Sequence, residues 1–506
     1  MAEPEPNANI QITYDADGRR AVTWNRYRPD GSAESVSHCF PDTVSHHYAP
    51  RGVGEDLRLY SGGFIDGRGK YFKGDVGIVW TPSPRVHVSG TRELTEDDLG
   101  DLFAVPSGPG IWSDIPEVLV EQPDNLVPPQ PDETYEPAEP PTVSHESIAD
   151  RVVGELGDRS MHLDSVTFLI PNGWDAGDGS RICNPHNLLQ HWPGRMTTNG
   201  DGWTATFDCV RAMDHKAWRA LRDSAGARFT HIGQLTRTDG STFTGEQALQ
   251  VLERIRLGLT LGLGRRTSCF LPVGYRNGQP VWASWRTLPV DPYTRMHSHW
   301  LSWETASAQL GDILAKVLDF TADEVRKEAL THALAYYVTT NTGIDSALGL
   351  GLAVSGLQLL SYFHFVTEGS HSRATWEVGH KTTEAEVREL LDAMNVSMPV
   401  PSHFINLAAV QARTDDGQRD ALGTVVNMRN HIVHPVRGRP GNHKPREWAE
   451  ASILANYWLG LALLHLVAYQ GDIRAALADG VHHDGDDLLP VPWAPAAIGT
   501  TWSAGG

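Results

Sequence analysis

The spacing of the apolar residues changes at about Trp303, and this change constrains the fold more than any other feature of the 506-residue chain. From there, three segments carry apolar residues at i, i+3 and i+4, which is the spacing of packed amphipathic helices: WETASAQLGDILAKVLDF, ADEVRKEALTHALAYYVTT and IDSALGLGLAVSGLQLLSYFHFV. The segments TEAEVRELLDAM, INLAAVQAR and DALGTVVNMRNHIVH follow. In the first of these, Thr383 is expected as the N-cap, and Glu386 three residues later predicts a capping box. Pro445 then opens a last long helix, which we expect to end near Gly471. About seven helices with short connections predict a helical bundle over residues 303–480.

Turn-forming pairs precede this region and indicate β-structure. In residues 1–110, pairs such as Asp17-Gly18 and Asp66-Gly67 supply the positive φ that tight hairpins require. The segments around them predict strands over 9–15, 20–26, 56–64 and 75–80. Residues 148–302 are expected to form a mixed α/β domain. In it, LDSVTFLIP and WTATFDCV predict strands, Asn199-Gly200 and Asn277-Gly278 predict turns, and EQALQVLERIRLGLTLGLG predicts a helix.

An acidic, proline-rich stretch separates the two β-containing regions. Residues 121–143 hold seven prolines and six acids, so the stretch has little to bury and is expected to be an extended spacer. We therefore predict a linker over 111–147 and a C-terminal tail over 481–506. The predicted fold class is α+β, with a β-rich N-terminal region followed by an all-α helical bundle.

Charge and cysteine content limit the function classes. The net charge of -20 argues against a protein that coats nucleic acid or an anionic membrane, although a local basic site remains compatible with it. The four cysteines form no C-x-x-C pair, which fits a reduced, cytoplasmic protein. The N-terminus is too polar for a signal peptide. The apolar run 453–469 contains polar residues, so we expect a buried bundle helix and no membrane span.

The stretch RNHIVHP, residues 429–435, carries the chemistry of greatest interest. Pro435 predicts that the preceding helix ends at His434, and Asn430 lies four residues before it on the same face. A histidine exchanges protons near neutral pH, and the guanidinium of Arg429 binds a phosphate and stabilises its charge in the transition state. Asn430 orients the phosphate or the histidine. These groups suffice for metal-free RNA cleavage by 2′-hydroxyl attack, which leaves a 2′,3′-cyclic phosphate.

Basic residues cluster beside this stretch. Six of the residues between Arg419 and Glu447 are lysine or arginine, against two acids. The segment RGRPGNHKPR therefore reads as a flexible loop suited to a phosphate backbone. We expect four of its side chains to bind substrate: Arg437, Arg439, Lys444 and Arg446.

Together, the motif and the following helix resemble a known family. The stretch is similar to the R-N-x-x-x-H form of the signature of HEPN domains, and YWLGLALLHLVAYQGDI is similar to the last helix of ApeA-like bacterial HEPN proteins. The resemblance is clearest over 304–475. It implies a metal-independent endoribonuclease that acts in anti-phage abortive infection. By position, it assigns Arg429 and His434 as the catalytic pair and Asn430 as their polar neighbour.

The resemblance also implies partners and no cofactor. HEPN domains typically dimerise, so that two motifs form one composite site. We accordingly expect a homodimer through the bundle, an RNA substrate with tRNA as one candidate, and a phage-derived trigger or regulatory protein that acts on the N-terminal region. There is one departure, because Gln358 stands where related bundles carry an acidic residue. The alternatives are a catalytically silent dimerisation module that binds RNA or nucleotides, and a toxin subunit restrained by another protein.

The remaining sequence patterns do not indicate a further functional site. The histidine clusters at His46-His47, at 297–299 and in HHDGDD at 482–487 lack a full set of metal ligands at a recognisable spacing, so we expect solvated loops and no metal. His431 is expected to be a solvated histidine, with RNA binding as the alternative. No phosphate-binding P-loop or G-x-S-x-G motif is present. The sixteen tryptophans are expected chiefly in the core.

Overall fold

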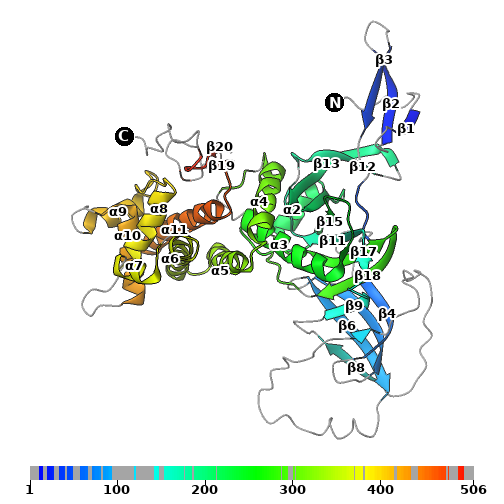
Figure 1. Cartoon of the computed structure of the whole chain (residues 1–506), viewed down its shortest axis with the longest axis horizontal. Helices are drawn as coiled ribbons and strands as arrows, with labels where there is room; N and C mark the ends of the chain where they lie inside the picture. The colour runs from blue at the N-terminus through cyan, green and yellow to red at the C-terminus, as the bar shows by residue number, and fades with distance from the viewer. Residues whose placement is uncertain are drawn as a thin grey trace.

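A computed structural model describes two parts of the chain. In the N-terminal part, it describes residues 11–14, 20–27, 33–39, 43–48, 57–65, 71–80, 84–93, 119–120 and 142–147. In the rest, it describes 153–494 except for 176, 185–186, 212, 287, 294–299, 303, 370, 380–381, 415–418, 435–442, 475–476 and 478–487. The described residues form a β-rich N-terminal half and a helical C-terminal half, as the sequence predicted (Figure 1).

Two sheets contain the first strands. One has the order β1-β2-β3, with bounds Gln11–Tyr14, Arg20–Tyr27 and Ala33–Cys39. The other has the order β7-β4-β5-β6-β8, with β4 at Leu57–Ile65, β5 at Tyr71–Val79 and β6 at Arg85–Glu93. Its edge strands, β7 at Leu119–Val120 and β8 at Thr142–Ser147, fall inside the stretch predicted as a linker. The turns at Asp17-Gly18 and Asp66-Gly67 and the acidic residues 121–141 lie outside the described residues.

An eight-stranded antiparallel sheet forms the middle of the molecule, in the order β12-β13-β14-β15-β11-β17-β18-β9. The bounds are β9 Val153–Gly157, β11 Ser165–Pro171, β12 Ser180–Asn184, β13 Asn187–Gly200, β14 Trp203–Cys209, β15 Phe229–Arg237, β17 Phe270–Arg276 and β18 Gln279–Arg286. A short pair, β10 at His162–Leu163 with β16 at Phe243–Thr244, accompanies it, and helix α2 spans His215–Asp223. The predicted strands LDSVTFLIP and WTATFDCV are therefore confirmed as β11 and β14.

One predicted turn is displaced. Asn277 and Gly278 both have positive φ and join β17 to β18, as predicted. At the other site, Gly200 is still paired with Trp203, and the turn falls two residues later, at Asp201-Gly202. The sequence offers Asn-Gly and Asp-Gly in succession, and the structure uses the second pair because Gly200 is needed elsewhere. A Cβ on Gly200 would lie 2.8 Å from the carbonyl oxygen of Ala315.

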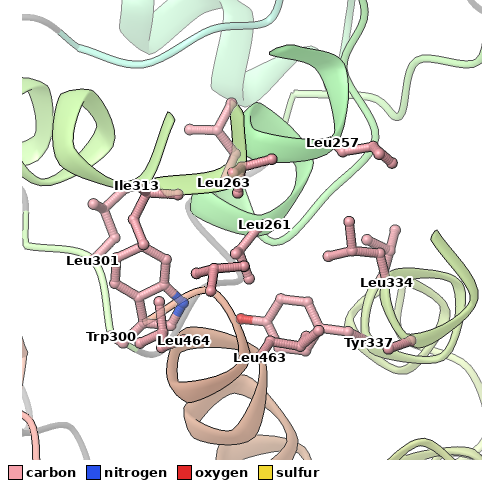
Figure 2. Packing of buried hydrophobic residues seen from close by; sticks show 14 of the residues in the cluster. Leu257, Leu261, Leu263, Trp300, Leu301, Ile313, Leu334, Tyr337, Leu463 and Leu464 are labelled. Carbon is pink, nitrogen blue, oxygen red and sulfur yellow. The ribbon is translucent and has the colours of Figure 1, made fainter. Parts of the chain in front are cut away.

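Helix α3 (Gly245–Leu263) connects the sheet to the helical half. Thr244 and Gln247 form a capping box at its start, and Gly264 ends it in the left-handed conformation. Figure 2 shows leucines of α3 packed against side chains of α4, α5 and α11, among them Ile313, Tyr337 and Leu463. These residues belong to one hydrophobic core that runs from the sheet through the bundle.

The predicted helices are all present. Their bounds are α4 Ala306–Phe320, α5 Glu324–Asn341, α6 Ser346–Tyr362, α8 Thr383–Ala393, α9 Ile405–Arg413, α10 Ala421–Val433 and α11 Pro445–Leu466. Between α6 and α8 lie a π-helical turn, η1 at Phe363–Thr367, and the short helix α7 at Arg373–Gly379. The helical segment predicted over 344–366 covers α6 and most of η1, whereas α7 was not predicted.

Three boundaries differ from the prediction. The N-cap of α8 is Thr382, whose side chain accepts from the amide of Ala385, so the predicted capping box at Thr383 is wrong by one residue. Helix α11 ends at Leu466, short of Gly471, with Ala468 in the left-handed conformation. The predicted tail is partly structured, because β20 (Leu488–Pro490) pairs with β19 (Asp472–Arg474).

Among the described residues, the helix Ser346–Thr367 is long and apolar enough to cross a membrane. Half of an apolar 18-residue window within this helix is buried inside the protein. The core helix of a globular protein meets the same criterion. The run 453–469, which the sequence analysis considered, forms a bundle helix in which Leu454, Trp458 and Leu463 are buried.

Candidate active site

Helix α10 positions the motif of greatest interest. Asp420 caps its first turn by accepting from the amide of Gly423 at 2.8 Å, and Arg388 of α8 donates to the same carboxylate at 3.0 Å. Burial alone would raise the pKa of Asp420, but these hydrogen bonds hold it below its ordinary value. The buried face of α10 includes Leu422, Val425 and Met428. The helix is therefore anchored at its start and along one face.

The other end of α10 reaches the surface. Arg429 and Asn430 are half-buried, and His434 is exposed. His434 is the C-cap, and its amide donates to the carbonyl of Asn430 at 2.8 Å. The helix thus ends where Pro435 predicted. Arg429, Asn430 and His434 lie within the last helical turn and its cap.

Arg429 and Asn430 are held together. Nη1 of Arg429 donates to Oδ1 of Asn430 at 3.2 Å, which leaves the amide NH₂ of Asn430 as the group that can donate elsewhere. Nε of Arg429 is buried and makes no hydrogen bond within the described part of the chain. The guanidinium also has no carboxylate partner there, so its charge remains available to an anion.

The predicted basic residues divide into two pairs. Lys444 and Arg446 are exposed in the first turn of α11, where the helix N-terminus also favours anions. Arg437 and Arg439 lie outside the described residues. Two of the four predicted phosphate ligands therefore lie at the start of α11, the helix that follows α10 in the chain.

The structure contains a polar cluster that was not predicted from the sequence. Arg413 of α9 donates to both carboxylate oxygens of Glu447, at 3.0 and 2.7 Å, and the amide of Lys444 donates to Glu447 at 2.9 Å. Nδ1 of His443 lies 3.5 Å from Glu447 and 3.4 Å from Nη2 of Arg413. Nε2 of His443 lies 3.2 Å from Nδ1 of His431, one residue beyond Asn430.

Ring contacts and charge fix this cluster. The ring of His443 stacks on His431 with centroids 5.4 Å apart and meets the edge of Trp448 at 4.9 Å. The hydrogen bonds from Arg413, partly opposed by burial, lower the pKa of Glu447 to about 2. Burial and the neighbouring His431 lower the pKa of His443. At neutral pH, the cluster therefore holds an ionised Glu447 beside a neutral His443.

The members of this polar cluster are far apart in sequence. His431 and His443 are 12 residues apart, and Arg413 and Glu447 are 34 residues apart. Only the i, i+4 spacing of His443 and Glu447 gives a local signal, and it is a weak one. The expectation that His431 is simply solvated was wrong, because it is half-buried and hydrogen-bonded.

Gln358 also has a partner. Its amide Nε2 donates to Oε2 of Glu386 on α8 at 2.6 Å, and Ser361 donates to the backbone carbonyl of Glu386. Gln358 therefore contacts a carboxylate from a neighbouring helix.

The described residues contain no group of three or more histidine, cysteine or acidic side chains that could hold a metal ion. His46 is buried, Nε2 faces the carbonyl of Leu271 at 2.9 Å, and burial lowers its pKa to about 3. It is a core histidine, and the expectation of a solvated loop there was wrong. Residues 297–299 and 482–487 lie outside the described part of the chain. Trp282, Trp285 and Trp300 are buried, as expected.

Comparison with known proteins gives two family matches. The YopA central domain matches residues 158–296, and the YopA C-terminal domain matches residues 323–483, which contain the whole candidate site. A Bacillus subtilis (strain 168) protein, "SPbeta prophage-derived uncharacterized protein YopA", is 23% identical over 284 residues. These residues are 55% of this chain and 61% of that relative, so the match spans less than two thirds of the relative's length. No solved structure matches the chain.

Proposed function

We propose that the protein is a metal-independent endoribonuclease whose site is the C-terminal end of α10. The observation that carries this proposal is the arrangement of Arg429, Asn430 and His434. A guanidinium that pairs with no carboxylate among the described residues is tied to an adjacent amide, and an exposed histidine caps the same helical turn. The similarity of this stretch to the HEPN signature supports the same assignment.

The chemistry follows from these groups. Arg429 binds the phosphate and stabilises the charge that develops on its oxygens. The amide NH₂ of Asn430 donates to the same phosphate, while its oxygen holds Arg429 in place. His434 transfers a proton at one of the two reacting oxygens. Lys444 and Arg446 contact phosphates further along the strand.

The proposal extends to a biological role. The enzyme would act in the cytoplasm as an abortive-infection effector that cuts RNA, with tRNA as one candidate, and as a homodimer through the bundle. Residues 1–302 would sense a phage-derived trigger or a regulatory partner. That the YopA relative is described as prophage-derived supports a setting in which phage and host compete.

Cleavage of tRNA in the presence of EDTA tests the activity. We expect total tRNA to be cut and the products to carry 2′,3′-cyclic phosphate and 5′-hydroxyl ends. R429A and H434A should each lower the rate by about 100-fold or more, because one loses charge stabilisation and the other proton transfer. H332Q, an exposed histidine on α5, is the matched control and should cut normally. Absence of cleavage by the wild-type protein, with and without phage lysate, would contradict the proposal.

One observation favours a second function. Gln358 stands where HEPN bundles carry an acid, and it is hydrogen-bonded to Glu386. If the site needs a free carboxylate at that place, the bundle is a silent RNA-binding or dimerisation module, or a toxin subunit held by a partner. That alternative predicts RNA binding that R429A weakens, together with no cleavage by any variant.

A further inference from the structure

Helix α6 carries an apolar surface that the bundle covers only in part. From Ser346 to Thr367 the sequence contains no aspartate, glutamate, lysine or arginine. Half of an apolar 18-residue window in this helix is buried, and Leu348 and Tyr362 are 54% and 37% exposed. An exposed apolar surface of this kind is typical of a contact with another molecule.

The outward-facing residues of α6 have a regular spacing. Leu352, Ser355 and Leu359 are half-buried and lie between the exposed Leu348 and Tyr362. The steps between the five residues are four, three, four and three, which is the spacing of a coiled-coil seam. On a helix with 3.6 residues per turn they fall within about 80° of one another. These five residues, here called the α6 stripe, therefore form one narrow face that suits another helix.

The α6 stripe is nearly symmetric about its middle residue. Leu348 and Tyr362 lie seven residues before and after Ser355, and Leu352 and Leu359 lie three before and four after it. An antiparallel copy of α6 would therefore place Ser355 against the partner's Ser355 and leucine against leucine, with large side chains at both ends. A two-fold contact requires a surface that complements itself in this way.

The polar groups on and beside the α6 stripe already have partners within the chain. The hydroxyl of Ser355 donates to the carbonyl of Gly351 at 2.9 Å, and Nε2 of Gln358 donates to Glu386 at 2.6 Å. The carboxylate of Asp345 accepts from two amides of the first turn of α6. Covering the stripe with a second helix therefore leaves these groups hydrogen-bonded, so the cost of burying them is small.

Charge favours a second copy of this chain as the occupant. The net charge is -20, so two copies repel each other wherever their acidic surfaces meet, and the α6 stripe has no charge. Its border on α5 is also uncharged, because a Cβ on Gly356 would lie 3.2 Å from the Cβ of Tyr336, and one on Gly349 would lie 3.5 Å from Cγ2 of Thr340. A strongly charged partner would find no opposite charge on this face.

We propose that the α6 stripe is the contact face of a homodimer in which the two α6 helices pack antiparallel about Ser355. This inference rests on the homodimer of the proposed function, for which it names the face, and it is tested without catalysis. Leu352, Ser355 and Leu359 form the centre of the contact. Leu348 and Tyr362 form its rim, where truncation of a side chain to alanine has little effect.

Sedimentation of the full chain over a range of concentrations tests the face. S355E and S355K should each raise the dissociation constant of the dimer by about 100-fold or more, because residue 355 then meets a like charge on its own copy. An equimolar mixture of S355E and S355K should form a dimer again, since opposite charges meet. V325E is the matched control, at a residue that is 55% exposed on α5, and should remain dimeric. Circular dichroism checks that each variant is folded.

A disulfide gives a second readout that does not need a charge inside the contact. S355C should cross-link to its own copy on mild oxidation, because the two-fold axis passes beside residue 355, whereas V325C should not.

The outcomes separate this face from the proposed function. A wild-type protein that is monomeric at every concentration overturns both the face and the homodimer, and flotation of that monomer with phosphatidylcholine vesicles would identify a membrane as the occupant. A dimer that S355E leaves intact, without cross-linking of S355C, shows that the homodimer uses another face. If S355E and S355K are folded monomers that do not associate when mixed, and S355C does not cross-link, the antiparallel arrangement is wrong. The tRNA assay measures the ribonuclease separately, so its failure alone leaves the contact face standing.

Discussion

Among single residues near the candidate site, Glu447 is one whose negative charge is compensated inside the protein. It is buried and paired with Arg413, and the hydrogen bonds from that arginine, partly opposed by burial, lower its pKa to about 2. Its folded pKa thus lies below the ordinary value near 4.5. The resulting stabilisation is fully present above pH 4.5 and is lost as the pH falls toward 2.

We expect E447Q to lower the free energy of unfolding at pH 7 by about 1–3 kcal/mol, because two charge-assisted hydrogen bonds are weakened. The difference from the wild-type protein should shrink as the pH falls from 4.5 toward 2. Urea unfolding at several pH values measures it. E324Q, which alters an exposed pair with Lys327, is the matched control and should change stability little. A constant difference across that pH range would contradict the assignment.

Gly200 makes a second residue-scale prediction. Its missing side chain lets α4 approach β13, since a Cβ there would lie 2.8 Å from both the carbonyl oxygen of Ala315 and the Cβ of Leu318. G200A should therefore destabilise the protein by about 1–3 kcal/mol. G351A in α6 is the control, because a Cβ there meets nothing within 4 Å and should be neutral or slightly stabilising. Thermal unfolding that ranks G200A above G351A in stability would be the contrary result.

At the element scale, the sequence predicted helices better than their ends. Apolar spacing located each long helix, because burial of one face dominates helix formation in a bundle. The cap of α8 moved from Thr383 to Thr382 because either threonine suits an N-cap and tertiary packing chooses between them. The turn moved from Asn199-Gly200 to Asp201-Gly202 for a similar reason, since contact with α4 decides it.

The candidate site was predictable only in part. Arg429, Asn430 and His434 are close in sequence, so helical geometry alone placed them together. Arg413, His443 and Glu447 reach the same place through packing of α9 and α11, and no local pattern encodes that packing. The stretches predicted as linker and tail contain short strands, because β7 pairs with β4, β8 pairs with β6, and β20 pairs with β19.

The packing of α3 against the bundle leads to an element-scale prediction. Leu261 is fully buried where α3 meets α5 and α11 (Figure 2). L261A should lower the free energy of unfolding by about 2–5 kcal/mol through lost burial and a cavity. L348A, at a leucine that is 54% exposed on α6, should change it by less than about 0.5 kcal/mol. Equal effects of the two substitutions in urea unfolding would show that α3 does not stabilise the bundle.

At the scale of the whole molecule, the sheet and the helical half share their core. Thr198 of β13 donates to the carbonyl of Gly311, the amide of Asp201 donates to Asp319, and Asn341 of α5 donates to the carbonyl of Gly264. Helix α4 lies between the two regions that match the YopA family models, and it packs on β13. The change of sequence pattern at Trp303 therefore marks a change of secondary structure within a continuous core.

This continuity predicts that residues 303–506 do not fold alone. Without the sheet and α3, the fragment would expose Leu314, Leu463 and other side chains that are buried in the full chain. We expect the fragment to aggregate or to bind a hydrophobic dye. The full chain should be folded and should unfold in one main transition. Size-exclusion chromatography and calorimetry check this. A monodisperse, cooperatively folded fragment would refute the shared core.

The same continuity bears on regulation. If the N-terminal half senses a trigger, the sheet, α3 and α11 form a packed path from that half to the helix that carries Glu447. We expect L261A, in addition to its effect on stability, to change cleavage in the absence of phage lysate more than L348A does. Comparison of basal tRNA cleavage by the two variants at a temperature where both are folded tests this coupling, and identical basal rates would argue against it.

An RNA oligonucleotide that the protein cuts at one mapped position tests cleavage by 2′-hydroxyl attack. Replacing the ribose on the 5′ side of that bond by 2′-deoxyribose removes the attacking hydroxyl. With EDTA present throughout, we expect no cleavage at the deoxy-substituted bond. The unmodified oligonucleotide should yield a cyclic phosphate in a reaction that requires Arg429 and His434. Continued cleavage of the deoxy-substituted bond, or products that end in a 3′-hydroxyl, would contradict it.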